Sequence, residues 1–199
     1  MKYKKFLEKS FEAFSLLEIA ISLAIIGILT LAVIKGQSLL YQARLDKTVA
    51  QIESIKISIE TFRSTYGNLP GDYNGDELQV EKKGDGNGII GENEAKEFWQ
   101  HLEAAGLLTK QQTTPALGGV FTIMHNAAND LPGHWILFSN PGNLGIMSSK
   151  DAIALKLKID GSSDNTSGSV RIKKADGKGG FTQMETTKQK ECIIFIEFP

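Results

Sequence analysis

An apolar stretch near the amino terminus constrains this chain more than any other feature. It reads FSLLEIAISLAIIGILTLAVIKGQ from Phe14 to Gln37 and contains one carboxylate, Glu18, near its front edge. A helix needs about 20 apolar residues to cross a bilayer, so the stretch is just long enough. A carboxylate within a membrane is energetically costly and usually has a functional partner. The sequence therefore predicts a membrane-spanning helix in which Glu18 has a specific role.

A short basic leader, MKYKKFLEKSFEA, precedes this stretch and holds four lysines against two glutamates. The excess of lysine predicts that this end lies in the cytoplasm and that the rest of the chain crosses the membrane. A cleavable secretory signal would have an apolar core of roughly 7 to 15 residues and a small-x-small cleavage site. The core here is longer and lacks a convincing triplet of that kind at its end. An uncleaved signal anchor, in which Glu18 only reaches the headgroups, remains the alternative.

The junction between leader and apolar stretch carries a second pattern. Ala13 is followed by Phe14, Ser15, Leu16, Leu17 and Glu18, and AIIGIL follows at 24–29. This pattern resembles the processing site of type IV prepilins and type II secretion pseudopilins. The residue before the cut is usually Gly in that family and is Ala13 here, and a Pro common later in the helix is replaced by Lys35. Without that proline, we expect a helix that lacks the usual kink.

The resemblance implies a processing step and an assembly role. A prepilin peptidase would cut between Ala13 and Phe14, and Phe14 would become the N-methylated first residue. Glu18 would become the fifth residue of the processed chain, and in filament assembly it would meet the Phe14 amine of a neighbouring subunit. Cleavage would thus supply the positive charge that the carboxylate lacks within an apolar helix bundle.

The helical pattern continues beyond Gly36. Apolar residues recur at spacings of three or four from Leu45 to Tyr66, and no proline interrupts residues 14–68. One half of this helix is therefore apolar all round, and the other half is amphipathic. The expected fold is α+β: a long amino-terminal helix packed through its amphipathic half on a small antiparallel sheet. The resemblance implies that this is the pilin fold.

Four segments follow from this pattern: a leader peptide at 1–13, a transmembrane or assembly helix at 14–36, an amphipathic half-helix at 37–66 and a periplasmic globular domain at 67–199. Gly67 to Asp72 supply a helix stop and turns, and a loop follows to Asn93. Within the domain the pattern predicts helices at 94–105, capped by Asn93, and 150–158, capped by Ser148 with Asp151. It predicts strands at 120–124, 134–138, 169–174, 181–185 and 191–198, of which the last is central because it is apolar without alternation.

Composition and motifs argue against catalysis and nucleic-acid binding. The 199 residues carry a formal net charge of -1, with lysines and acids interspersed, so no nucleic-acid partner is expected. The histidines, His101, His125 and His134, form no HExxH or His-x-His pair, and His101 reads as a surface or half-buried structural residue. No metal site other than calcium, and no organic cofactor, is expected. The resemblance assigns catalysis to the peptidase and to an assembly ATPase, so the chain itself is predicted not to be an enzyme.

Calcium is the one ion for which the loops offer ligands. Asp85 and Asn87 alternate with glycines, and Asp160, Ser162, Asp164 and Thr166 alternate in a second loop. Neither loop has the glutamate at the twelfth position that completes an EF-hand, and Asp and Asn also favour ordinary turns. Cys192 is the only cysteine, so it forms no internal disulfide. We expect it to be buried in the last strand, with an intermolecular bond as the alternative.

Together these features favour a structural subunit of a type IV pilus-like filament. Within that family, the favoured assignment is a type II secretion pseudopilin or a minor pilin. A surface pilin for adhesion, motility or DNA uptake is the rival within the family, and a signal-anchored periplasmic binding or hydrolytic domain is the rival outside it. The implied partners are prepilin peptidase, other pilin or pseudopilin subunits, an inner-membrane assembly platform with its ATPase, and membrane lipid before assembly. The implied location is the inner membrane, single-pass, with a cytoplasmic amino terminus and a periplasmic domain, and later a periplasmic or surface filament.

Overall fold

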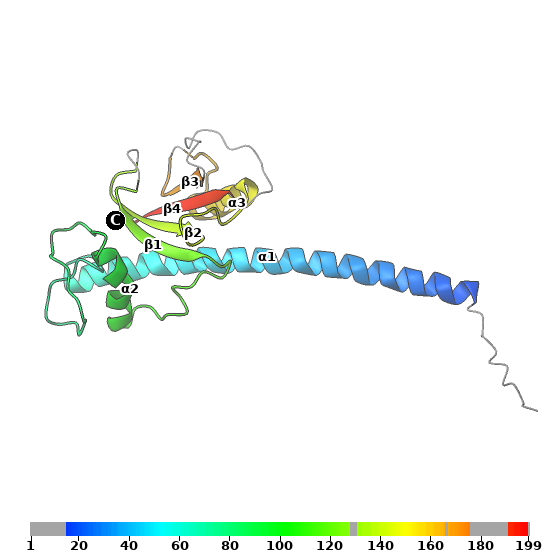
Figure 1. Ribbon diagram of the computed structural model, residues 1–199, viewed down its shortest axis with the longest axis horizontal. Coiled ribbons are helices and arrows are strands. Elements are labelled where there is room, and N and C mark those ends of the chain that lie inside the picture. Colours follow the sequence, from blue (N-terminus) through cyan, green and yellow to red (C-terminus); the bar gives the residue numbers. More distant parts are fainter. Residues whose placement is uncertain (1–14, 128–130, 166, 176–190, 199) are drawn as a thin grey trace, which may run out of the picture. The chain divides into compact units, whose positions relative to one another are not determined.

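The structure is a computed structural model of the chain, and it describes residues 15–127, 131–165, 167–175 and 191–198. Its elements, shown in Figure 1, are α1 (Leu16–Tyr66), α2 (Glu94–Ala104), β1 (Val120–His125), β2 (His134–Ser139), α3 (Ser149–Asp160), β3 (Val170–Lys174) and β4 (Cys192–Phe198). The chain divides into two compact units, Met1–Gln42 and Ala43–Pro199, and α1 contributes residues to both. The predicted α+β class is confirmed. The strand expected at 181–185 lies outside the described residues.

Helix α1 runs without interruption through 51 residues. It ends where the sequence predicts, because Gly67 adopts a left-handed backbone conformation (φ 76°) that glycine takes without steric cost. The Gly67 N–H donates to the Arg63 carbonyl at 2.9 Å, which satisfies one of the last carbonyl groups of the helix. The continuous helix through Lys35 agrees with the absence of proline there.

The four described strands form one antiparallel sheet in the order β1-β2-β4-β3. Phe121 pairs with Phe138 between β1 and β2, and Ile136 pairs with Ile196 between β2 and β4. The carboxyl-terminal strand β4 therefore lies between β2 and β3, which confirms the prediction of a central last strand. Its position explains its composition, since a central strand covered on both faces has no solvent side to fill with polar residues.

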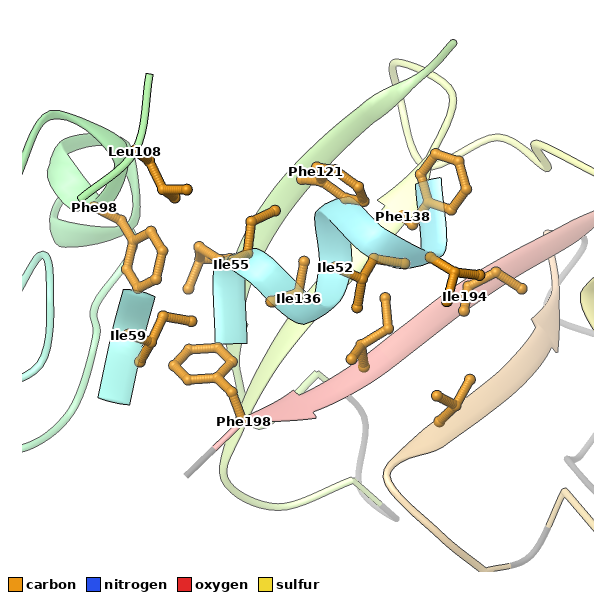
Figure 2. Packing of buried hydrophobic residues seen from close by; sticks show 14 of the residues in the cluster. Ile52, Ile55, Ile59, Phe98, Leu108, Phe121, Ile136, Phe138, Ile194 and Phe198 are labelled. Atoms are coloured by element: carbon orange, nitrogen blue, oxygen red, sulfur yellow. The ribbon is translucent and has the colours of Figure 1, made fainter. Parts of the chain in front are cut away.

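One face of the sheet packs against the second half of α1, within the unit formed by residues 43–199. The predicted helical stripe is confirmed, and its members are buried: Leu45, Val49, Ile52, Ile55, Ile59 and Phe62. Figure 2 shows three of these isoleucines against side chains from β1, β2 and β4. Each buried aliphatic side chain of this kind contributes about 1.5 to 3 kcal/mol to folding, so this stripe is what fixes the sheet to the helix.

The opposite face of β2 and β4 has its own apolar cluster. It comprises Leu131, Trp135, Leu137, Ile193 and Phe195, all of them at most 6% exposed. The Trp135 indole N–H donates to the Pro132 carbonyl at 2.9 Å, so the polar atom of this ring is satisfied. Both faces of the central strands are thus buried.

Polar residues of α1 hold the segment between α2 and β1. The Gln51 side-chain amide donates to the carbonyls of Gln112 and Thr114 and accepts from the Ala116 N–H at 2.9 Å. The Thr48 hydroxyl accepts from the Leu117 N–H at 3.2 Å. A segment without regular structure needs such partners for its backbone groups, and α1 supplies them from the edge of its apolar stripe.

The helix caps follow the prediction in one case and depart from it in another. The Ser148 hydroxyl accepts from the Asp151 N–H at 3.3 Å and donates to the Asp151 carboxylate at 2.7 Å, so α3 has the predicted cap. The prediction that Asn93 caps α2 was wrong, because Asn93 adopts a helical backbone conformation and makes no side-chain cap. Instead, the Glu94 carboxylate reaches back to accept from the Gly91 N–H at 2.7 Å.

Candidate functional site

The residues on which the processing prediction depends are described only in part. Ala13 and Phe14, the predicted cleavage and methylation positions, lie outside the described residues, and the description begins at Ser15. Glu18, the predicted assembly residue, is described and is exposed. The geometry therefore bears on Glu18 and its helix.

Ser15 caps the start of α1. Its hydroxyl accepts from the Leu17 N–H at 3.3 Å, and its carbonyl accepts from the Ile19 N–H at 3.2 Å. Glu18 is the third residue of the helix, so Ser15 and Glu18 occupy the two positions of the S-x-x-E capping pattern. The sequence analysis missed this role of Ser15, although the S-x-x-E spacing signals it. A negative charge in the first turn also interacts favourably with the helix dipole, by about 0.3 to 1 kcal/mol.

From Ser15 to Gln42, α1 buries no residue, and its large apolar side chains are exposed: Leu16, Leu17, Ile19, Ile21, Leu23, Ile25, Ile26, Ile28, Leu29, Leu31, Val33, Ile34, Leu39 and Leu40. The hydroxyls of Ser22 and Thr30 donate to carbonyls four residues earlier, both at 2.8 Å. They therefore need no outside partner in an apolar environment. No hydrogen bond or ion pair joins the Glu18 side chain to another described residue.

By length and composition, α1 qualifies as a membrane-crossing helix. A single helix of this kind near the amino terminus is weak support for a membrane span, because a signal sequence has the same properties. The informative feature is the contrast along one helix between an exposed apolar part that carries Glu18 and a part that forms a domain core.

The first predicted calcium loop brings three carboxylates together. Side-chain oxygens of Asp72, Asp85 and Glu94 all lie within 4.8 Å of one another. Asp72 is fully buried, and its carboxylate accepts from the N–H groups of Gly86 (2.7 Å), Asn87 (3.2 Å) and Gly88 (2.7 Å). Burial raises the pKa of Asp72, and the Glu94 charge adds to this, against the lowering effect of the Gly88 and Gly86 N–H groups.

The predicted ligands Asp85 and Asn87 bond to each other in this loop. The Asn87 side-chain amide donates to the Asp85 carboxylate at 2.7 Å, and its oxygen accepts from the Ile89 N–H at 2.6 Å. Sequence spacing did not indicate Asp72 or Glu94 as members of the cluster. Asp72 lies in the turn region that follows α1, and Glu94 is the first residue of α2. Oxygen ligands in this arrangement suit a hard cation, and calcium here stays a prediction.

The second predicted calcium loop is built differently. Asp160 accepts from the Lys156 ammonium at 2.6 Å, from the Val170 N–H at 2.9 Å, and from the Ser169 N–H and hydroxyl at 3.1 and 2.7 Å. Burial favours the neutral form of Asp160, but Lys156, Ser169 and the Val170 N–H together outweigh it, so the pKa lies below its ordinary value. Asp164 accepts from the Ser167 hydroxyl at 2.9 Å. Thr166 lies outside the described residues.

His101 is a core residue, and the prediction of a surface or half-buried position was wrong. It is fully buried on α2, where its Nδ1 accepts from the Gly71 N–H at 2.9 Å. Its Nε2 lies 2.8 Å from the Lys82 carbonyl, to which it donates in the matching tautomer. The sequence around His101 gives no signal of this role, because its partners are backbone groups of a loop that lies 19 and 30 residues earlier.

The other two histidines face each other across β1 and β2. His125 pairs with His134, and their ring centroids lie 4.7 Å apart. The His134 Nε2 accepts from the Ile90 N–H at 3.2 Å, whereas the His125 Nδ1 is buried without a hydrogen-bond partner among the described residues. The described contacts of these rings are with each other, with the Phe198 ring and with a backbone N–H.

Cys192 is buried at the start of β4, as predicted. Its sulfur lies 3.5 Å from the Ser149 hydroxyl, and burial raises the pKa of the thiol. A thiol with these surroundings is unreactive at neutral pH, which favours packing over an intermolecular bond.

Comparisons with known proteins add one likeness. No family model matches the chain, and a search of the curated proteins found no match. Among solved structures, the major type IV pilin PilA1 of Clostridium difficile matches with 11% sequence identity and a TM-score of 0.43, over 78% of this chain and 94% of that chain. An identity and a TM-score this low say nothing about function. The evidence for function therefore has to come from the chain's own residues.

Proposed function

We propose that this protein is a structural subunit of a type IV pilus-like filament. One observation carries the proposal: a single unbroken helix is apolar and exposed in its first part, where it holds one acid at its start, and forms the core of a small α+β unit in its second part. Exposed apolar side chains in such number need lipid or other helices around them. Two successive environments, membrane and then filament, meet this need.

Within that role, the favoured assignment is a type II secretion pseudopilin or a minor pilin. Prepilin peptidase would cut between Ala13 and Phe14, and an assembly platform with its ATPase would move the subunit from the inner membrane into the filament. Before assembly the domain would lie in the periplasm. The support for these steps is the junction pattern before Glu18.

Processing is tested by mass spectrometry of the protein from cells that express a prepilin peptidase. We expect the mature chain to begin at N-methylated Phe14. A chain that keeps Met1 under these conditions overturns the prepilin assignment and leaves the alternative, a signal-anchored binding or hydrolytic domain.

Assembly is tested at Glu18 with two substitutions. Glu18→Gln keeps the length of the side chain and an oxygen for the capping position, whereas Glu18→Ala removes both. If the charge pairs with a neighbouring amine, both variants should be cleaved normally and both should lose at least about tenfold in filament incorporation, as an apolar bundle strengthens ion pairs. Normal incorporation of Glu18→Gln would show that the charge of Glu18 is not needed for assembly.

The calcium prediction is tested by thermal unfolding of the full chain in detergent. Calcium at the first loop would neutralise the repulsion among Asp72, Asp85 and Glu94, so added Ca²⁺ should raise the melting temperature relative to chelator, and Asp85→Asn should reduce that rise. Mg²⁺ at equal concentration is the control for ionic strength. Equal melting temperatures in Ca²⁺ and in chelator contradict binding at both loops.

A further inference from the structure

A fully buried lysine lies at the junction of α3 and β3. The Lys156 side chain has no solvent exposure. Its ammonium nitrogen lies 2.6 Å from the Asp160 carboxylate, 2.8 Å from the Ser167 carbonyl and 2.8 Å from the Val170 carbonyl. An ammonium group has three N–H donors, and here each has an acceptor at hydrogen-bond distance. The charge is therefore compensated without water.

The three acceptors are of the kind that bind hard cations. One carboxylate oxygen and two main-chain carbonyls converge on a single point, and these are typical ligands of metal ions such as calcium. The chain passes close to this charge at Gly168. A Cβ atom on Gly168 would lie 2.4 Å from the Asp160 carboxylate and 3.2 Å from the Lys156 nitrogen, so the loop closes on the charge only because residue 168 is glycine.

The same contacts close the outer edge of β3. At Val170 the N–H donates to Asp160 and the carbonyl accepts from Lys156. Two residues further on, the Asn165 side-chain amide bonds both backbone groups of Ile172, each at 2.8 Å. An edge strand whose outward backbone groups are paired in this way offers few free N–H and C=O groups to a strand of another chain.

We propose that the Asp160 carboxylate and the carbonyls of Ser167 and Val170 form a cation site that the chain fills with its own ammonium group, and that Lys156 there replaces a bound metal ion. The site is matched to a primary ammonium. It connects Asp160, Ser167 and Val170, and it pairs the Val170 carbonyl of β3 independently of ions in the surroundings. This inference concerns the domain alone and does not depend on filament assembly.

Chemical rescue tests the proposal in the full-length protein. Lys156→Ala should lower the melting temperature by roughly 10 °C, because the buried Asp160 carboxylate loses its positively charged partner. Propylammonium, which restores the missing atoms of the side chain, should recover several degrees of that loss at millimolar concentration. The neutral isostere 1-propanol should recover much less. Lys156→Met, which fills the same space without charge, is the matched control and should not respond to propylammonium. Equal recovery by propylammonium and 1-propanol, or none by either, overturns the proposal.

A double-mutant comparison covers the case in which Lys156→Ala does not fold. Lys156→Met combined with Asp160→Asn should melt at a higher temperature than Lys156→Met alone, because the second change removes the uncompensated charge. If Asp160→Asn lowers the melting temperature equally in both backgrounds, the two groups do not act as an ion and its ligand, and the proposal fails.

Discussion

His134 is the residue whose protonation the structure controls most strongly. Burial, together with the nearby positive charges of His125 and Arg63, lowers the pKa of His134 to about 4. The neutral ring accepts a hydrogen bond from the Ile90 N–H, which a protonated ring at that nitrogen would lose. The Phe198 ring also lies near His134, and the two ring centroids are 5.6 Å apart. The surroundings thus favour the neutral form by burial, by charge and by hydrogen bonding.

This arrangement predicts a loss of stability in mild acid. An unfolded histidine takes up its proton near pH 6.5, whereas folded His134 takes it up near pH 4, so the unfolded state binds more protons between these values. The free energy of unfolding therefore falls as the pH decreases from about 6.5 to about 4. Thermal unfolding at half-unit pH steps from 7.5 to 4 measures the effect.

The matched variant is His134→Gln, whose side-chain oxygen can accept from the Ile90 N–H but does not titrate. Its melting temperature should fall less than that of the wild type over the same pH range. The effect of carboxylates that titrate in both proteins cancels in this comparison. Parallel pH profiles for the two proteins would show that His134 is not the group responsible.

At the scale of elements, α2 and the preceding loop form one unit through His101. The helix presents His101 toward Phe62 and Tyr73, with ring centroids 6.4 and 6.1 Å away, and its nitrogens hold the backbone at Gly71 and Lys82. A loop of this length, with little regular structure, needs such fixed points to satisfy its buried backbone groups. His101 supplies two such fixed points, one at Gly71 and one at Lys82.

We expect His101→Phe to be strongly destabilising. It preserves the size and stacking of the ring but leaves the Gly71 N–H and the Lys82 carbonyl without partners, at about 1 to 3 kcal/mol each. The melting temperature should fall by roughly 5 to 15 °C. His125→Phe is the control, because the His125 Nδ1 has no described hydrogen-bond partner to lose. Similar losses in both variants would assign the effect to ring replacement rather than to the two hydrogen bonds.

The elements themselves were largely predictable from local pattern. Helix α1 ends at Tyr66 as its apolar spacing and Gly67 indicate, and β4 is central as its composition indicates. The two errors have different causes: a competing bond close by for Asn93, and partners distant in sequence for His101. The Asn93 cap was pre-empted because Glu94 bonds Gly91, and His101 was misplaced because its partners are backbone groups 19 and 30 residues away.

For the molecule as a whole, the two predicted sites differ in how far the sequence reveals them. The Glu18 region is visible in the sequence, whereas the carboxylate cluster is assembled only by folding. Glu18 and the apolar run are contiguous in sequence, so their pattern is visible without a structure. Asp72, Asp85 and Glu94 come together only when the loop folds back on α2. Spacing rules detect ligands two or three residues apart, whereas Asp72 lies 13 residues before Asp85, and Asp85 lies 9 residues before Glu94.

The division of the chain predicts that the unit 43–199 folds by itself. Every buried apolar residue of the described chain lies at Leu45 or later, and residues 15–42 bury none, so removing the first 42 residues takes nothing from either core cluster. The fragment beginning at Ala43 should melt within a few degrees of the full-length chain in detergent and keep its near-ultraviolet circular dichroism. A fragment beginning at Glu53 is the matched control. It lacks Leu45, Val49 and Ile52, whose loss costs about 2 to 5 kcal/mol for each large aliphatic side chain removed from a core, and it should not fold. An unfolded Ala43 fragment would mean that the first part of α1 supports the domain, contrary to the burial pattern.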